Sequence, residues 1–243
     1  VSGKVSAAGK NPGGAGGLVG QNCSEYDKDT LFTIASAIDK CSADVAVTGL
    51  YKVGGLVGEN GGIITESAAV GTVTAEKGVY TGGFVGDNTG DIYNCHADGD
   101  VTGDNHTGGF AGFSDGTVKN CYSIGTVTGT EYTGSFAGAI SKADFVIGAG
   151  KVIVNGTSGQ GYNAGFAGEL GGQLSGMANQ VTIKDAYGNC VSADGVLNIC
   201  GNQSKFTGEA EKEKLSDMTL STMKDVSEKL YEMFGVNLSI KNL

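Results

Sequence analysis

A glycine-rich pentad recurs six times along the chain. The copies are GGLVG at 16–20, GGLVG at 54–58, GGFVG at 82–86, GGFAG at 108–112, GSFAG at 134–138 and AGFAG at 164–168. The smallest step between successive copies is 26 residues, and the longer steps contain insertions, the largest of them at residues 23–38. Repeats of roughly 20–50 residues are typical of stacked architectures, in which one unit cannot bury its apolar face alone but neighbouring units can. The pentad therefore predicts a stacked repeat fold.

Two other landmarks keep phase with the pentad. Cys41, Cys95 and Cys121 each stand 14 residues before the second pentad position of the next unit. Short β-rich runs also recur, namely VAVTG at 45–49, GTVT at 71–74, GDVTG at 99–103 and GTVTG at 125–129. Each unit thus holds three brief strand-like runs with Gly, Asn or Asp turns between them. This pattern predicts an all-β fold, a right-handed parallel β-solenoid of about six coils.

Stacked coils should place equivalent side chains in rows, with neighbouring strands about 4.8 Å apart. The expected core rows consist of Phe84, Phe110, Phe136, Cys41, Cys95 and Cys121. Free cysteine packs as a small hydrophobe, so replacing Cys95 by serine is expected to destabilise the fold by about 1–3 kcal/mol. Cys190 follows Asn189 as Cys95 follows Asn94, which makes Cys190 a candidate late member of the cysteine row.

The C-terminal stretch changes character. We assign residues 1–204 to the solenoid and residues 205–243 to a C-terminal cap, because glycine becomes scarce after residue 205. A helix is expected over about residues 221–234, ending near Gly235. Its apolar stripe consists of Met223, Val226, Leu230 and Met233.

Composition excludes several classes of partner. The chain has 243 residues with 44 glycines, no tryptophan and a net charge of −10, and every basic residue is a lysine. An acidic chain without arginine is poorly suited to phosphate backbones or anionic membranes, so no nucleic-acid partner is expected. No apolar run approaches the roughly 18 residues of a spanning helix, so no membrane insertion is expected. A monomer or a part of a longer chain fits these features.

The repeated phrases resemble the GLUG repeat. GGLVGEN, GGFVGDNTGDIYNCHADGDVTG and GGFAGFSDGTVKNCYSIGTVTG share its Gly-Leu-aliphatic-Gly core, the following Asn-Cys and the Gly-x-Val-x-Gly. The resemblance covers residues 14–170 well and 171–204 loosely, and the fifth unit departs from it at Val146, near the expected cysteine. It implies bacterial secreted or cell-surface proteins, including adhesin-like proteins and non-catalytic parts of IgA-specific zinc metallopeptidases.

Exposed side chains on such a rod could bind a ligand. Tyrosines are common in interfaces, and the candidate ligand-binding residues are Tyr80, Tyr93, Tyr122 and Tyr132. Carboxylates in turns could hold calcium, and the candidate metal ligands are Asp87, Asp91 and Asp104. No cofactor is indicated. The partner that the resemblance favours is a host or cell-wall glycan or glycoprotein.

Catalytic constellations are sparse. The two histidines, His96 and His106, are ten residues apart without an HExxH motif, so zinc proteolysis is not indicated and both are expected as exposed turn residues. The acidic run from Asp87 to Asp104 could supply paired carboxylates for glycan cleavage, although Asp also simply favours turns. We therefore expect a non-enzymatic extracellular or cell-surface module, acting as an adhesion surface, stalk or spacer. The alternative is a glycan-cleaving β-helix enzyme.

The remaining cysteines leave the disulfide state open. Cys23 and Cys200 fall outside the phase of the cysteine row. A Cys23–Cys41 or a Cys190–Cys200 bridge is therefore an open alternative to free thiols.

Overall fold

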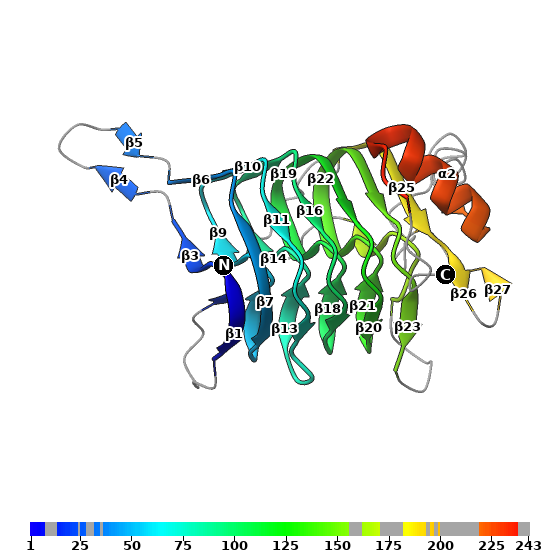
Figure 1. The fold of residues 1–243 in the computed structure, drawn as a ribbon, viewed down its shortest axis with the longest axis horizontal. Coiled ribbons are helices and arrows are strands. Elements are labelled where there is room, and N and C mark those ends of the chain that lie inside the picture. The colour runs from blue at the N-terminus through cyan, green and yellow to red at the C-terminus, as the bar shows by residue number, and fades with distance from the viewer. Residues whose placement is uncertain are drawn as a thin grey trace.

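The computed structural model describes residues 1–7, 14–23, 25–27, 32–34, 36–155, 162–170, 182–192, 195–196, 199 and 219–237. The chain is mostly β, with parallel sheets wound into a β-solenoid of about five turns and one short helix near the C-terminus. Figure 1 shows the coils side by side along one axis, with the N-terminal coil and the helix at opposite ends. The predicted solenoid is confirmed, with about five turns in place of six. Its right-handed winding stays a prediction.

One face of the rod is a row of parallel strands stacked through the whole repeat. Its members are β1 (Ser2–Ser6), β7 (Ser42–Thr48), β12 (Val73–Thr74), β17 (Val101–Thr102), β20 (Val127–Gly129) and β23 (Val152–Val154). Each pairs with its neighbour in register, so that Val47, Val73, Val101 and Val127 form one buried row. The recurring GTVT run therefore supplies one wall of the core.

A second face is a five-stranded parallel sheet that leads into the pentads. Its members are β2 (Ala15–Gly16), β8 (Tyr51–Gly54), β13 (Val79–Gly82), β18 (Asn105–Gly108) and β21 (Glu131–Gly134). In this sheet the first glycines of successive pentads lie opposite one another.

The third set of strands begins directly after the pentads. It continues past a sharp turn in each coil, hereafter the corner, to the end of the coil. The strands directly after the pentads are β3 (Val19–Asn22), β9 (Val57–Asn60), β14 (Val85–Asn88), β19 (Ala111–Ser123), β22 (Ala137–Gly148) and β24 (Ala167–Leu170). The strands next to and beyond the corner are β6 (Ala37–Asp39), β10 (Ile63–Thr65), β11 (Ala68–Ala69), β15 (Asp91–Tyr93), β16 (His96–Ala97), β25 (Thr182–Asn189) and β28 (Thr219–Leu220). In β19 and β22 the two groups merge into single long strands.

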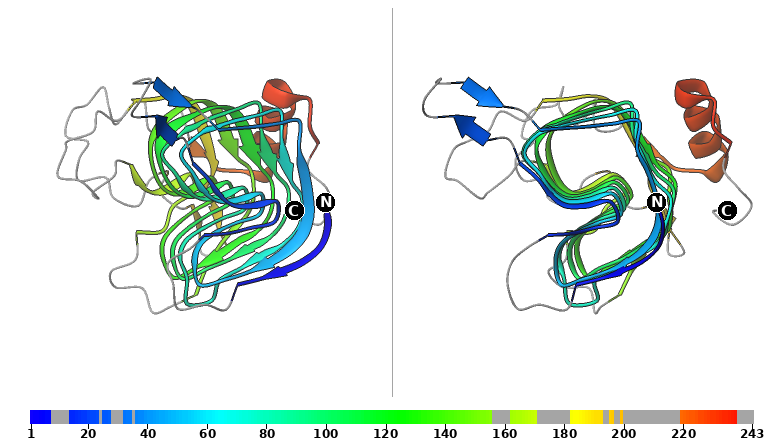
Figure 2. Two further views of the ribbon diagram at one scale, coloured as in Figure 1. Left: turned by 90° about the vertical axis from the view of Figure 1, so that its left-hand side faces the viewer. Right: turned by 60° about the vertical axis from the view of Figure 1, so that its left-hand side comes forward.

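Each coil bends inward at the pentad. Figure 2 shows this bend in end view, where the blue strands β2 and β3 run into the coil outline and back out, giving it two lobes. The strands before and after the pentad form the two arms of this bend, and their backbones touch. Glycine permits this contact because it has no side chain. A Cβ on Gly86 would lie 2.3 Å from the carbonyl carbon of Lys52, and a Cβ on Gly112 would lie 2.4 Å from that of Tyr80. The last pentad glycine is thus needed for close approach of backbone to backbone.

Phenylalanines stack through the core at the tip of this bend. The rings of Phe84, Phe110, Phe136 and Phe166 are fully buried, and successive centroids lie 4.7, 5.0 and 5.4 Å apart with nearly parallel planes. Leu56 continues the row toward the N-terminus. The predicted row Phe84, Phe110 and Phe136 is confirmed.

A buried polar row runs beside the aromatic one. Asn22, Asn60 and Asn88 are buried, and each side-chain amide donates to the next coil: Asn22 Nδ2 to Asn60 Oδ1 at 2.7 Å, and Asn60 Nδ2 to Asn88 Oδ1 at 2.7 Å. Asn88 Nδ2 then donates to Ser114 Oγ at 3.0 Å, and Ile140 takes the next position. Such amide rows satisfy buried polar groups without water.

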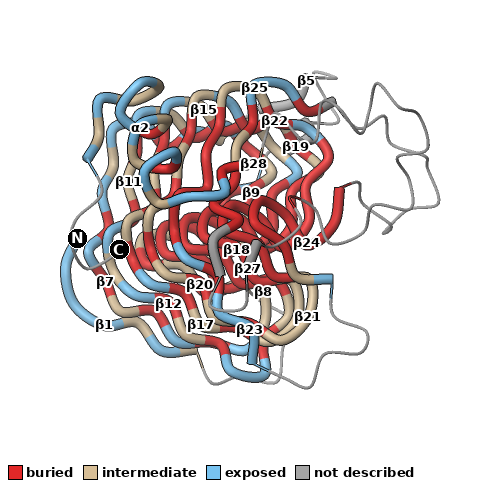
Figure 3. Tube along the Cα trace, turned by 90° about the vertical axis from the view of Figure 1, so that its right-hand side faces the viewer, coloured by how far each residue is buried: buried red, intermediate tan, exposed pale blue. Residues whose placement is uncertain are grey.

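The helix α2 (Met223–Phe234) has a capping residue at each end. Thr222 caps its N-terminus by accepting a hydrogen bond from the Asp225 amide, and Gly235 ends it in the left-handed region with φ 68°. Its buried side chains, Val226 and Leu230, pack against the outer side of several coils, beside Ile147. Figure 3 shows alternating buried and exposed positions along the outer strands of the rod. Within the described ranges, no helix is long and apolar enough to cross a membrane.

The predicted domain boundary lies outside the described residues, as do residues 205–218 of the predicted cap. The insertion at 23–38 contains an antiparallel hairpin, β4 (Glu25–Asp27) with β5 (Phe32–Ile34), which projects from the first coil (Figure 1). A second small hairpin joins β26 (Val191–Ser192) to β27 (Gly195–Val196). Both hairpins leave the stacked register of the coils undisturbed.

Candidate functional site

The corner of each coil turns at a residue in the left-handed region. Lys40, Glu66, Asn94, Asn120 and Phe145 have φ between 46° and 56°. Asparagine tolerates this conformation better than most residues, which explains the Asn in the Asn-Cys motif.

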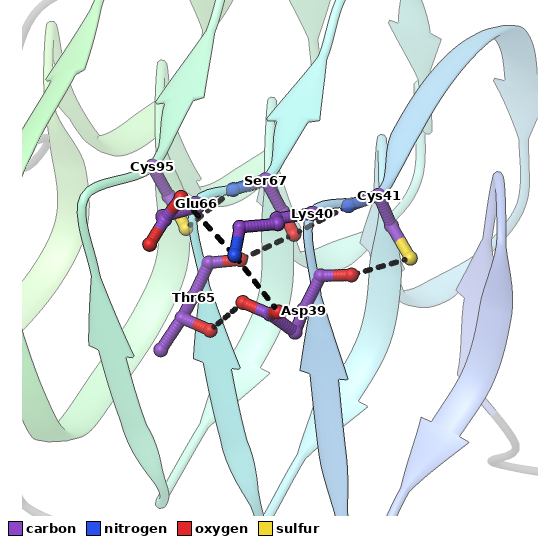
Figure 4. Close-up of polar contacts among 7 residues, drawn as sticks. All are labelled: Asp39, Lys40, Cys41, Thr65, Glu66, Ser67 and Cys95. Atoms are coloured by element: carbon purple, nitrogen blue, oxygen red, sulfur yellow. Dashed lines mark hydrogen bonds and ion pairs between the residues drawn. The ribbon is translucent and has the colours of Figure 1, made fainter.

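The small residue after the corner closes it by hydrogen bonds. Cys95 Sγ lies 3.1 Å from the Tyr93 carbonyl oxygen, and Ser67 Oγ donates to the Thr65 carbonyl at 2.7 Å. Figure 4 shows how this links coils: the Cys41 amide donates to Ser67 Oγ at 3.0 Å, and the Ser67 amide reaches Cys95 Sγ at 3.4 Å. Serine and cysteine therefore do the same structural work at this position.

The corners of the later coils form a pocket of about 550 Å³, hereafter the corner pocket. Its lining residues are Tyr93, Asn94, Lys119, Asn120, Asp144, Phe145, Lys184 and Asp185. The lining consists of two adjacent rows, because Tyr93, Lys119, Asp144 and Lys184 are successive partners in the parallel register. The repeat itself thus builds the pocket.

Polar groups in the corner pocket hold one another in place. Lys119 Nζ lies 2.8 Å from Asp144 Oδ2, and Asn120 Nδ2 donates to Asn94 Oδ1 at 2.5 Å. The hydrogen bond from Lys119 lowers the pKa of Asp144, so this carboxylate stays charged. A tyrosine ring beside amide, ammonium and carboxylate groups offers both a flat apolar face and hydrogen-bonding groups to a polar ligand.

A second row of aromatic residues, hereafter the aromatic row, lies in the inward bend. Tyr80, His106, Tyr132 and Tyr162 follow one another with ring centroids 5.3, 4.4 and 5.2 Å apart. Tyr80 also contacts Phe113 on the opposite arm of the bend, with centroids 5.2 Å apart. The row therefore joins the two arms of the coil as well as successive coils.

His106 is held neutral within the aromatic row. Its ring stacks on Tyr132 at an interplanar angle of 9°, and Nδ1 is hydrogen-bonded to Asn105 Oδ1. Burial lowers the pKa of His106 to about 4. The expectation that both histidines are exposed turn residues was wrong: His96 is also partly covered, stacked on Tyr122 with centroids 4.9 Å apart.

One charged cluster closes the inward bend at its N-terminal end. Lys52 Nζ lies 2.8 Å from Glu59 Oε1 and 2.8 Å from Asp87 Oδ2. The Lys52 and Asp87 side chains are only 15% and 10% exposed, and Glu59 is 28% exposed. The two carboxylates lie on adjacent strands at the same register position.

The four predicted tyrosines do not form one surface. Tyr93 lies in the corner pocket, and Tyr80 and Tyr132 lie in the aromatic row. Tyr122 lies elsewhere, between His96 and Phe234 of helix α2. The expectation that Tyr80 is exposed was wrong, because the inward bend covers it with the opposite arm.

The predicted metal ligands are not brought together. Asp87 is paired with Lys52, Asp91 lies on β15 opposite Ile63, and the Asp104 carbonyl accepts hydrogen bonds from the Thr130 and Glu131 amides. In the part of the chain that the structure describes, no three His, Cys, Asp or Glu residues are grouped so as to hold a metal ion.

The cysteine row is confirmed in part. Cys95 and Cys121 are buried neighbours with free thiols, whereas Cys41, at the N-terminal end of the row, is only partly buried. Val146 and then Ala186 continue the row, so Cys190 is not its late member. Cys23 and Cys41 are both free, so no bridge joins them, and Cys200 lies outside the described residues.

The sequence reasoning overlooked two groups. The buried asparagine row has a visible signal, because Asn22, Asn60 and Asn88 each stand two residues after a pentad. The Lys52 cluster has no such signal, because the equivalent positions one coil later are Tyr80 and Phe113.

Comparison with known proteins supports the repeat assignment. Two adjacent segments, residues 78–102 and 103–128, match the GLUG motif and are GLUG repeats, as the pentads predicted. They contain Tyr80, Tyr93, His106 and Tyr122. No curated protein matches the chain. No solved structure matches it either.

Proposed function

We propose that this chain, which carries two adjacent GLUG repeats, is a non-catalytic extracellular module of a bacterial secreted or surface protein. It serves as an adhesion surface on a rod that also acts as a stalk or spacer. Its partner is a host or cell-wall glycan or glycoprotein. The observation that carries this proposal is the corner pocket, where Tyr93 lies beside two asparagine amides and paired charges.

The chemistry of the corner pocket suits a hydroxyl-rich ligand. Asn94 and Asn120 bring amide groups, and Lys119 and Asp144 bring a donor and an acceptor of opposite charge. Sugar hydroxyls both donate and accept, so they can match such a mixed lining, while the apolar face of a sugar can lie on the Tyr93 ring. The pocket runs over several coils, so a chain of sugars can follow the rod.

The carboxylates of Glu59, Asp87 and Asp100 already have partners within the chain, which supports a non-catalytic role. Glycan cleavage needs one carboxyl group as an acid and a second as a base or nucleophile, both free to reach the substrate. The adjacent carboxylates of Glu59 and Asp87 are instead bound to the same lysine. Asp100 is also engaged, since its Oδ1 accepts a hydrogen bond from the Thr126 amide.

A binding panel tests the proposal. The purified chain is scored against bacterial and host glycans and glycoproteins for retention and, in the same wells, for release of new reducing ends. Tyr93→Ala is expected to weaken retention by on the order of tenfold, because it removes the aromatic contact. Tyr162→Ala is the matched control, since Tyr162 is 40% exposed and lies outside the corner pocket.

Each outcome is informative. Retention that depends on Tyr93 and not on Tyr162 supports the corner pocket as the adhesive site. Retention lost only in Tyr162→Ala would move the site to the aromatic row. Release of reducing ends would overturn the non-catalytic proposal in favour of a glycan-cleaving enzyme. No retention at all would leave the rod as a stalk or spacer without an adhesive role.

A further inference from the structure

The Lys52 cluster joins three reactive groups across the inward bend. Lys52 comes from one arm of a coil, Glu59 from the other arm of the same coil, and Asp87 from the next coil. We propose that Lys52 and Asp87 form a modification site, at which the chain closes an intramolecular amide bond between Nζ and Cγ with Glu59 transferring the protons. This inference is independent of the adhesive role.

The distances suit bond formation. Asp87 Oδ2 lies 2.8 Å from Lys52 Nζ. Given a C–O bond of about 1.25 Å, Nζ then lies roughly 3.5 Å from the carboxyl carbon, near the ~3–3.5 Å of a near-attack conformer. Glu59 Oε1, at 2.8 Å from the same nitrogen, is placed to accept a proton from it.

The surroundings favour the neutral form of the Asp87 carboxyl group. Asp87 is buried, and burial raises the pKa of its carboxyl group against the opposing effect of Lys52. Asp87 Oδ1 is buried without a hydrogen-bond partner among the described residues, so half of the carboxylate is left unstabilised. The neighbouring Tyr80 and Phe113 rings form a buried apolar cluster beside it.

The cluster holds Lys52 as an ammonium ion, so the reaction requires a proton transfer inside the cluster. Burial by itself lowers the pKa of Lys52, but its hydrogen bonds to Asp87 and Glu59 raise it above the ordinary value. The amine therefore becomes neutral by passing a proton to a neighbouring carboxylate, and not by releasing it to solvent at neutral pH. Such a proton transfer is slow. A slow reaction is sufficient here, because the bond needs to form only once in each molecule.

The reaction balances without any other reagent. A proton moves from the Lys52 ammonium to the Asp87 carboxylate, and neutral Nζ attacks Cγ of the resulting acid. Glu59 takes a proton from the attacking nitrogen and delivers it to the departing hydroxyl group. The Cγ–O bond breaks, the Nζ–Cγ bond forms and one water leaves. One ammonium and one carboxylate become one amide, with no change of oxidation state.

The product places an uncharged amide where the ion pair stood. The pair of buried charges disappears, and the amide N–H can donate to the remaining Glu59 carboxylate. Replacing a buried ion pair by a neutral group is often stabilising, because the desolvation of the charges no longer opposes folding.

The chain contains a matched comparison. Lys119 Nζ and Asp144 Oδ2 are also 2.8 Å apart, but these side chains are 52% and 30% exposed. The described residues place no second carboxylate within ion-pair distance of Lys119. This pair should stay unlinked, because solvent stabilises both charges.

Mass spectrometry of the full chain tests the proposal. The purified, reduced and denatured protein is expected to be lighter than its sequence by one water, and protease digestion should yield a branched peptide joining the segments around Lys52 and Asp87. Asp87→Ala and Lys52→Arg should have their full sequence mass. Glu59→Gln should fold with the same circular dichroism and also keep its full mass, because the proton-transfer group is absent.

The outcomes are distinct from those of the binding panel. A wild-type mass equal to that of the sequence, with separate peptides containing Lys52 and Asp87, would overturn the proposal even if the chain binds glycans. A missing water that maps to Lys119 and Asp144 would overturn it as well. A Lys52–Asp87 link that persists in Glu59→Gln would overturn the role of Glu59.

Discussion

Two lysine–aspartate pairs in this rod have the same separation and opposite surroundings. Lys52 and Asp87 meet inside the inward bend, whereas Lys119 and Asp144 meet at the outer corner, each at 2.8 Å. The first pair spans the two arms of the bend and the second joins register partners on adjacent strands, so the two pairs reach the same separation by different routes. Burial distinguishes them, because it weakens the solvation of each charge and makes the loss of one partner costly. The bend therefore buries one such pair, whereas the corner leaves the other exposed to solvent.

Removing the lysine from each pair tests this contrast most strongly. Lys52→Ala is expected to lower the free energy of unfolding by about 1–3 kcal/mol, because it leaves the buried Asp87 carboxylate beside Glu59 with neither the ammonium group nor the proposed amide link. Lys119→Ala is expected to leave stability unchanged within error, since Lys119 is solvated. Urea unfolding of both variants at neutral pH is the measurement. Equal effects would show that burial does not separate the two regions.

His106 offers a pH test of the inward bend. Its pKa in the folded chain is about 4, below the ordinary 6.5, so the unfolded chain binds more protons between these values. The contribution of His106 to stability is then full above pH 6.5 and falls by up to about 3 kcal/mol as the pH decreases toward 4. The fall should be smaller in His106→Tyr, because this variant lacks the titrating imidazole. Tyrosine should fit at this position, because Tyr80 and Tyr132 adopt the same left-handed conformation in the same row.

The control for this pH test is the other histidine. His96→Tyr should keep the wild-type dependence, because His96 lies outside the aromatic row, stacked on Tyr122. Unfolding midpoints measured between pH 4 and pH 7.5 provide the comparison. A slope in His106→Tyr that matches the wild type would mean that other groups determine the acid sensitivity, such as Asp144, whose pKa is lowered by its hydrogen bond from Lys119.

The smallest expected effect is at the corner. Cys95→Ser was expected from sequence to cost about 1–3 kcal/mol, as an unpaired hydroxyl in the core. The structure revises this, because Ser67 already occupies the equivalent position and makes hydrogen bonds to Thr65 and Cys41. We now expect a loss below about 1 kcal/mol. Thermal unfolding is measured for Cys95→Ser and for Cys95→Leu, whose larger side chain overfills the corner. The comparison separates the effect of hydrogen bonding at this position from the effect of side-chain volume.

Periodicity explains what could be foreseen. The phenylalanine row, the cysteine positions and the parallel register all repeat with the pentad, so each coil confirms the next. The corner also follows from the sequence, because Asn tolerates the left-handed turn and a small residue can close it. Even the replacement of cysteine by Val146 appears in the structure at the place that the phase indicates.

Contacts that occur once could not be foreseen in this way. The pairing of Lys52 with Asp87 is replaced one coil later by the pairing of Tyr80 with Phe113. The ion pair therefore leaves no repeated signal in the sequence. The burial of Tyr80 was missed for a related reason. Tyr80 was expected among the exposed side chains, but the pentad glycines bring the two arms of the bend together, so Tyr80 packs against Phe113.

The stacked register also determines how the rod would respond to tension. The first coil and helix α2 lie at opposite ends, and each coil pairs only with its immediate neighbours (Figure 1). A pull along the axis would therefore strip coils one at a time, and a coil of 26 residues would release roughly 90 Å of extended chain. A rod built on such coils would lengthen by one coil at a time under load, with longer steps where a unit carries an insertion.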